Sequence, residues 1–195
     1  MKPVDAFWFS DAKLVLPSGI VEGALHVVGG RIAAIRSRVP RGARGLNLHG
    51  AFLAPGFIDL HVWGEAERLS RELPREGTTA FLKAIGPEPP ERLVNHLVRL
   101  GGLPEGQGAR CLGAHLEGPF LNPLRAGALA SRWLRPPASQ ELRQLARCGG
   151  NRLKLMTIAP ELPGAFSAIR WCRRYRMVAS LGHSDADAEV AQRAI

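Results

Sequence analysis

Two apolar runs in the sequence each end in a side chain that could do chemistry. Residues 110–116 (RCLGAHL) lead into Glu117 and then into a Gly-Pro pair, which predicts a buried strand that ends in a turn. Residues 177–182 (MVASLG) lead in the same way into His183. A carboxylate and an imidazole are ligands that a catalytic metal accepts. The pattern predicts metal-assisted chemistry at the strand ends of an α/β sheet.

Each of these side chains also has a purely structural interpretation. Glu117 could cap its turn or pair with an arginine such as Arg125, and a lone histidine at a strand end, like His183, is more often structural than a ligand. His115 lies two residues before Glu117, so strand geometry puts both on one face. It could orient Glu117 or pack inside a barrel. The residues alone leave these alternatives open.

Strands and helices alternate from about residue 55 onward. Strands are expected at 56–62, 79–85, 110–116, 152–158 and 177–182. Helices are expected at about 65–75, 90–100, 139–148, 163–175 and from residue 185 on. Pro90 and Pro163 suit first helical turns, Ser139 suits an N-cap, and Ser184 with Asp185 suits the cap of the last helix.

This spacing implies right-handed βαβ units and a parallel sheet. Five units are fewer than the eight of a complete barrel, which needs roughly 250 residues. The predicted fold class is therefore α/β, with an incomplete TIM-type (β/α) barrel of about five βα units over residues 55–195.

Residues 1–54 have a different pattern of short aliphatic strands. Runs at 13–16, 24–28 and 31–35 are followed by a loop at 40–45 and one more short strand. The Gly-Gly pair at 29–30 is a hairpin signal between the second and third runs. A small antiparallel β-sandwich segment is expected to precede the barrel.

Composition limits the class of partner and the compartment. The formal charge is +9, from 26 Lys and Arg against 17 Asp and Glu, but the arginines are scattered along the chain. Solvated helix faces are therefore expected, and no nucleic acid partner is expected.

Three cysteines without metal-like spacing predict reduced thiols in the cytoplasm. No signal peptide is expected, and no membrane partner, because no apolar run approaches about 18 residues.

Several motifs, in order along the chain, carry a family resemblance. HLEGPFLNP at 115–123, APELPGA at 159–165 and SLGHSDA at 180–186 resemble the N-acetylglucosamine-6-phosphate deacetylases of the amidohydrolase superfamily. LAPGFIDLHV at 53–62 resembles the strand that opens the barrel in that superfamily. The resemblance implies metal-assisted hydrolysis of the acetamide of N-acetylglucosamine 6-phosphate, which gives glucosamine 6-phosphate and acetate in amino-sugar catabolism.

The resemblance also implies a ligand set. The family's glutamate and histidine at Glu117 and His183 bind the catalytic divalent metal, which we expect to be one Zn²⁺. His61 begins the superfamily's His-x-His pair, but Trp63 stands at the second position, and indole has no free lone pair for a metal. His61 and His115 are kept as possible ligands.

The sugar-binding residues depart from the family pattern. The family usually has histidine at the position of Leu129, while Ala128 beside it can still offer its backbone to the substrate. The family's third ligand, its general-base aspartate and its phosphate-binding residues would lie beyond Ile195, and no histidine follows His183. Asp185 and Asp187 are expected in the first turn of a helix, so no catalytic residue is assigned.

We therefore expect the N-terminal part of such a deacetylase, with weak or absent metal binding and no activity alone. The sequence leaves two alternatives open. One is a non-catalytic module that binds an amino-sugar phosphate. The other is one half of a split enzyme, completed by a C-terminal fragment. A homo-oligomer is kept as a further possible partner.

Overall fold

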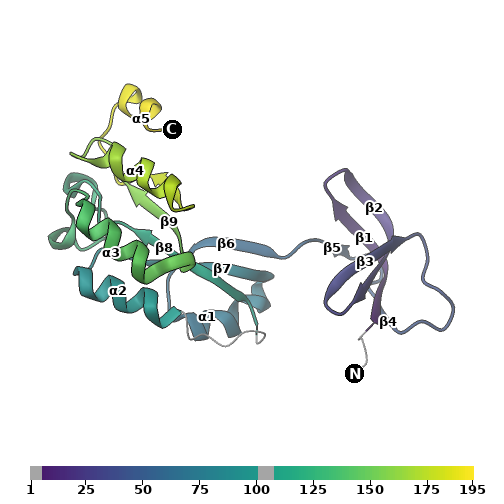
Figure 1. Cartoon of the computed structure of the whole chain (residues 1–195). Coiled ribbons are helices and arrows are strands. Elements are labelled where there is room, and N and C mark those ends of the chain that lie inside the picture. Colours follow the sequence, from purple (N-terminus) through teal and green to yellow (C-terminus); the bar gives the residue numbers. More distant parts are fainter. Residues whose placement is uncertain (1–5, 101–107) are drawn as a thin grey trace. The chain divides into compact units, whose positions relative to one another are not determined.

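The computed structural model describes residues 6–100 and 108–195 (Figure 1). Residues 1–5, part of the N-terminal stretch that is expected to lack a signal peptide, lie outside the described residues. The chain divides into two compact units, Met1–Pro55 and Gly56–Ile195. This division does not test whether either unit folds alone, so the domain boundary near residue 54 stays a prediction.

Unit 1 is a five-stranded mixed sheet. Strands β1 (Ala6–Leu16), β2 (Gly19–Val28) and β3 (Arg31–Arg36) pair antiparallel in sequence, whereas β4 (Gly45–Asn47) and β5 (Phe52–Leu53) run parallel to β1. The expectation of a wholly antiparallel sheet is therefore wrong for the last two strands. The loop after β3 carries the chain back across the sheet, so β4 enters in the same direction as β1.

The hairpin predicted at Gly29 and Gly30 joins β2 to β3, and both glycines have positive φ (58° and 74°). Strand β1 is longer than expected because a register shift between Phe9 and Ala12 absorbs the polar residues that interrupt its apolar pattern. Asp11 lies in this bulge with φ of 52°.

Unit 2 is built on five parallel strands in the order β10-β9-β8-β7-β6, a curled half-barrel. The strands are β6 (Phe57–Val62), β7 (Thr78–Ile85), β8 (Arg110–Glu117), β9 (Leu153–Ile158) and β10 (Val178–Leu181). Each strand pairs in parallel with its neighbour in sequence, as expected of consecutive βαβ units. The predicted incomplete (β/α) barrel is confirmed.

Helices alternate with these strands. They are α1 (Ala66–Glu72), α2 (Pro90–Arg99), α3 (Ser139–Gly149), α4 (Ala165–Arg174) and α5 (Ala188–Ala194). Short 3₁₀ turns occur at η1 (Leu73–Glu76), η3 (Pro123–Arg125), η4 (Ser131–Trp133) and η5 (Gly150–Arg152). Helices α2, α3 and α4 lie along one face of the sheet (Figure 1).

Two helix starts differ from expectation. Pro90 does begin α2, but α4 begins at Ala165, because Gly164 takes positive φ (84°) just before it and leaves Pro163 outside. Ser139 is the first residue of α3, and the cap position before it makes no side-chain hydrogen bond.

The last helix also begins later than expected. Its N-cap is Asp187, whose carboxylate accepts a hydrogen bond from the Val190 N–H at 2.8 Å. Ser184 and Asp185 lie in the turn before α5 because their polar groups are engaged by other loops. The interpretation of these two residues as the helix cap is wrong.

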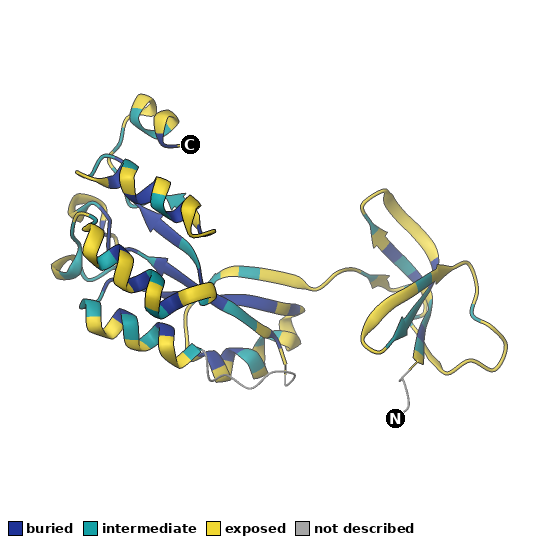
Figure 2. Cartoon of the chain, in the orientation of Figure 1, coloured by how far each residue is buried: buried dark blue, intermediate teal, exposed yellow. Residues whose placement is uncertain are grey.

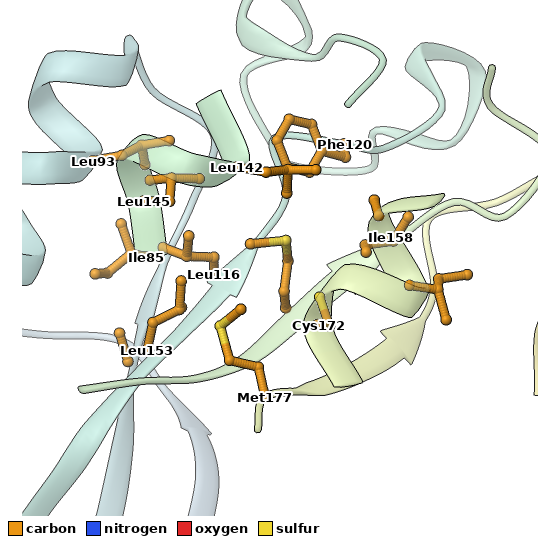
Figure 3. Packing of buried hydrophobic residues seen from close by; sticks show 14 of the residues in the cluster. Ile85, Leu93, Leu116, Phe120, Leu142, Leu145, Leu153, Ile158, Cys172 and Met177 are labelled. Carbon is orange, nitrogen blue, oxygen red and sulfur yellow. The ribbon is translucent and has the colours of Figure 1, made fainter. Parts of the chain in front are cut away.

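The core of unit 2 lies between the helices and the sheet (Figure 3). Leu93 of α2, Leu145 of α3 and Cys172 of α4 pack there against Leu116 of β8 and Ile158 of β9, all at most 1% exposed. Leu116 directly precedes Glu117, so the packed core fixes the strand end that carries the carboxylate.

No helix in residues 6–100 and 108–195 is both long and apolar enough to cross a bilayer.

Candidate metal-binding site at the strand ends

Glu117 and His183 meet at the carboxyl edge of the sheet. Glu117 is the last residue of β8, and His183 follows β10. Nε2 of His183 lies 3.0 Å from Oε1 of Glu117, and the two side chains are only 26% and 17% exposed. The structure thus brings together the two residues that the sequence singled out, while their role as metal ligands stays a prediction.

The second nitrogen of His183 fixes the orientation of its ring. Nδ1 lies 2.8 Å from the carbonyl oxygen of Arg125, and since a carbonyl only accepts, Nδ1 carries the proton of that hydrogen bond. In a neutral imidazole the lone pair of Nε2 then faces the carboxylate of Glu117. Two lone pairs at that distance need a proton or a cation between them. A histidine that donates Nδ1–H to a backbone carbonyl is typical of metal ligands.

The donor set is small. Among residues 6–100 and 108–195, no three or more His, Cys, Asp and Glu side chains are grouped so that they could hold a metal ion. The chemistry of Glu117 and His183 fits a divalent cation, but it supplies two ligands where a catalytic zinc ordinarily has three.

The turn after Glu117 directs its side chain. Gly118 has φ of 99°, a conformation that other residues rarely adopt, and a Cβ there would come within 3.0 Å of Cδ1 of Leu121. The peptide between Gly118 and Pro119 is cis. Glycine at this position is therefore required by the local backbone. The alternative in which Glu117 pairs with Arg125 is not realised, because Arg125 pairs with Asp185.

His115 lies behind the site, 6% exposed. Its Nε2 lies 2.7 Å from Oγ1 of Thr157, and its Nδ1 lies 3.1 Å from the carbonyl oxygen of Leu60 and 2.9 Å from Nδ1 of His61. Burial holds the pKa of His115 below its ordinary value, and the neighbouring His61 lowers it further. Both ring nitrogens are engaged, so the geometry favours the packed, interior interpretation over that of a ligand.

His61, in β6, approaches the other oxygen of Glu117. Its Nε2 lies 3.4 Å from Oε2 of Glu117 and 3.1 Å from Nε1 of Trp63. A neutral imidazole has one N–H and one lone pair. When Trp63 donates to Nε2, His61 cannot donate from that atom to Glu117, and the lone pair is not free for a metal.

The loop that carries Ala128 and Leu129 lies beside His183. A Cβ on Gly127 would be 3.8 Å from Cε1 of His183. A Cβ on Gly86 would be 2.9 Å from Cη2 of Trp63 and 3.8 Å from Cδ2 of Leu129. The two residues that depart from the family pattern, Trp63 and Leu129, therefore both approach Gly86 and make this part of the site apolar.

Sequence reasoning missed Glu161, which lies three residues after β9. Its carboxylate accepts hydrogen bonds from Ser184 Oγ, from the Asp185 N–H and from Asn122 Nδ2. Burial alone would raise the pKa of Glu161, but these hydrogen bonds outweigh burial and hold the pKa below its usual range. The rule that found Glu117, an acidic residue shortly after a buried strand, would have found Glu161 too.

Comparisons with known proteins find similarity to deacetylases of N-acetyl amino-sugar 6-phosphates. No protein-family model matches the chain. The N-acetylglucosamine-6-phosphate deacetylase of Bacillus subtilis is 28% identical over 94% of this chain and 52% of its own length. The N-acetylgalactosamine-6-phosphate deacetylase of Escherichia coli O157:H7 is 31% identical over 83% of this chain and 46% of its own length.

A solved structure shows the same relationship in three dimensions. The N-acetyl-D-glucosamine-6-phosphate deacetylase of Mycobacterium smegmatis, in complex with N-acetyl-D-glucosamine-6-phosphate, superposes with a TM-score of 0.86 at 26% identity. The match covers 97% of this chain and 53% of that one.

The curled sheet of five parallel strands, preceded by a smaller mixed sheet, defines an incomplete TIM-type barrel. The chain is a homologue of the N-acetylglucosamine-6-phosphate deacetylases and corresponds to their N-terminal part. It spans about half the length of the curated relatives it matches.

Proposed function

We propose that Glu117 and His183 are two ligands of a divalent metal in a site for deacetylating N-acetyl amino-sugar 6-phosphates. The observation that carries the proposal is the 3.0 Å approach of Nε2 of His183 to the Glu117 carboxylate, while Nδ1 donates to a backbone carbonyl. The names of the homologues support the substrate class. Relatives named for glucosamine and for galactosamine both match, so the proposal covers both sugars.

Zinc is the proposed metal because one carboxylate oxygen and one imidazole nitrogen suit its ligand preferences. A bound divalent metal would polarise the amide carbonyl and lower the pKa of the attacking water. The residues of this chain would hold and orient it: Glu117 through its fixed turn, and His183 through the hydrogen bond to Arg125.

The proposed role of the 195 residues stops at binding and orientation. Asp185 is paired with Arg125, and Asp187 caps α5, so neither is placed to take a proton from water. We propose that a further ligand and a general base must come from another segment, and that the chain alone turns over substrate at background rate.

Trp63 and Leu129 shape the proposed sugar subsite. In place of a polar side chain, Leu129 offers an apolar one beside Trp63, while Ala128, an exposed residue, would still offer its backbone to the sugar. A cytoplasmic location is part of the proposal, since all three cysteines are free.

A zinc titration of the purified chain tests the proposal. We expect weak one-to-one binding that is lost in Glu117→Gln and in His183→Gln, and kept in Glu72→Gln, whose carboxylate forms an exposed ion pair with Arg68. Tight binding that neither site substitution changes would refute the ligand assignment.

A turnover assay with N-acetylglucosamine 6-phosphate addresses the second part of the proposal. We expect acetate release at background. Release by the 195-residue chain that a chelator stops would contradict the need for a further ligand and base.

A further inference from the structure

His183 has an unusual backbone conformation. Its φ is 50°, in the left-handed region that residues other than glycine seldom occupy. Such a conformation persists only where the surroundings fix it. The contacts that fix the turn after β10 therefore also decide where the His183 ring points.

Three hydrogen bonds hold this turn. The N–H of Asn122 donates to the carbonyl of His183 at 3.0 Å. Ser184 Oγ donates to Oε2 of Glu161 at 2.6 Å, and the N–H of Asp185 donates to Oε1 of Glu161 at 2.6 Å. The carbonyl of His183 and the two residues after it are thus tied to other segments.

Glu161 also ties this turn to a second one. Nδ2 of Asn122 donates to Oε1 of Glu161 at 2.9 Å, while Oδ1 of Asn122 accepts from the N–H of Leu124 at 2.9 Å. The two contacts fix the orientation of the Asn122 amide. One carboxylate therefore joins the turn after Pro119 to the turn that carries His183.

Glu161 acts on the ring of His183 through two connections, one along the Asn122 turn and one along the Ser184–Asp185 turn. The Asn122 turn leads into η3, which ends at Arg125, and the carbonyl of Arg125 accepts from Nδ1 of His183. Arg125 in turn forms an ion pair with Asp185. Releasing Glu161 would loosen both the backbone of His183 and the carbonyl that orients its ring.

We propose that Glu161 is a positioning residue that clamps the Asn122 turn to the Ser184–Asp185 turn and so keeps Nε2 of His183 directed at Glu117. The proposal rests on the proposed function, because it assigns the clamp a role in metal affinity. Glu161 itself is not a ligand, since its hydrogen bonds go to the two turns.

The main test variant is Glu161→Gln. The amide keeps the size of the side chain but replaces one acceptor oxygen with a donor, so it cannot accept from Asn122, Ser184 and Asp185 together. Ser184→Ala removes one of the three hydrogen bonds and is the milder variant. The matched control is Glu141→Gln, whose carboxylate is 11% exposed and bound to Arg135 outside this turn.

Zinc alone, titrated into the full chain and followed by NMR, gives the first readout. Loss of an interaction that orients a metal ligand weakens affinity about 10–100-fold. We expect a loss of that size in Glu161→Gln, a smaller one in Ser184→Ala, and none in Glu141→Gln. Equal affinity in wild type, Glu161→Gln and Ser184→Ala would overturn the proposal even if the metal site stands.

The proton on Nδ1 of His183 in the metal-free chain gives the second readout. Long-range ¹H–¹⁵N correlations should show that Nδ1 carries a proton in wild type, as its hydrogen bond to the Arg125 carbonyl requires, and should show a mixture of rings with and without that proton in Glu161→Gln. If zinc binding proves independent of Glu117 and His183, the proposed function fails, and the Nδ1 proton alone decides on the clamp. An unchanged Nδ1 proton in Glu161→Gln overturns the clamp, whereas general destabilisation would affect Glu141→Gln as well.

Discussion

His183 and Glu117 come from strands that are not neighbours, yet Nε2 of one lies 3.0 Å from Oε1 of the other. Strand β9 separates β8 from β10, and its own residue Thr157 pairs in register with Glu117. The curl of the half-barrel lets the two strand ends reach across β9. The same edge gathers His61 from β6, so three of the five strands contribute to one polar cluster.

Removing the indole N–H of Trp63 should strengthen the contribution of His61 to metal binding. In Trp63→Phe the hydrogen bond to Nε2 of His61 is lost, and the freed lone pair can face a cation beside Glu117. Because one hydrogen bond contributes about 0.5–1.5 kcal/mol, we expect zinc affinity to rise roughly two- to tenfold. Titration of the variant against wild type measures the change.

A double-mutant cycle with His61→Gln controls for indirect effects. The gain in Trp63→Phe should vanish when His61 is also replaced. A gain that persists in the double variant would mean that Trp63 acts on the site by packing against Gly86 and not through His61.

The apolar side chains on the strands of unit 2 should drive self-association. Leu60, Leu82, Leu155 and Val178 line a hollow of about 470 Å³ together with Leu112, Lys154 and Arg176. Leu60 and Val178, on the two edge strands β6 and β10, are 54% and 62% exposed. Strand β6, at one edge of the sheet, is largely exposed (Figure 2). Edges and apolar patches of this kind promote association.

Sedimentation at increasing concentration should therefore show wild-type oligomers, and Val178→Lys should shift them toward monomer. Val98→Lys, at a residue of α2 that is 54% exposed, is the control and should leave the distribution unchanged. A wild-type chain that stays monomeric and unfolds cooperatively at all concentrations would contradict the expectation.

The features of unit 2 that depend on local residue patterns could be predicted from the sequence. The strands of unit 2 were found because each is an apolar run bounded by turn residues, and Glu117 and His183 stood out because they end such runs. The parallel pairing of β4 and β5 in unit 1 was missed, since it depends on where a loop returns the chain.

The contacts around the site were harder to predict because they also depend on segments far apart in the sequence. Ser184 and Asp185 looked like a helix cap, but Glu161, more than twenty residues earlier, takes their hydrogen bonds. The competition between a local cap and a distant carboxylate is decided by tertiary structure and not by the spacing of residues.

Alkaline pH should destabilise the core through Cys172. Burial raises the pKa of this thiol to about 11 from an ordinary value of 9.0. Because of the raised pKa, the folded state keeps the thiol proton to a higher pH than the unfolded state does. The contribution of this thiol to the free energy of unfolding is therefore complete below pH 9 and is lost as pH rises through about 11. The difference between a pKa of 9.0 and one of about 11 corresponds to about 2–3 kcal/mol.

Urea unfolding measured from pH 8 to pH 11 should show the free energy of unfolding falling as the pH rises. We expect this slope in wild type and in Cys148→Ala, whose thiol is partly exposed. Cys172→Ala should lose less stability over this pH range whatever its baseline stability, while Cys111, whose pKa burial also raises, still contributes. An equal slope in both variants would assign the alkaline loss to other groups.

Thr157 should be required for the stability of unit 2 because its hydroxyl is the partner of buried His115. Oγ1 lies 2.7 Å from Nε2, and no buried side-chain nitrogen or oxygen in the described residues lacks a partner. Thr157→Val keeps the shape but leaves Nε2 unpaired, which should cost about 1–3 kcal/mol in the free energy of unfolding. Thr157→Ser keeps the hydroxyl and should cost less.

Tryptophan fluorescence measured in a Trp8→Phe background reports on the unfolding of unit 2 alone, since Trp63, Trp133 and Trp171 all lie there. If Thr157→Val were as stable as Thr157→Ser, the hydrogen bond to His115 would contribute nothing to the free energy of unfolding.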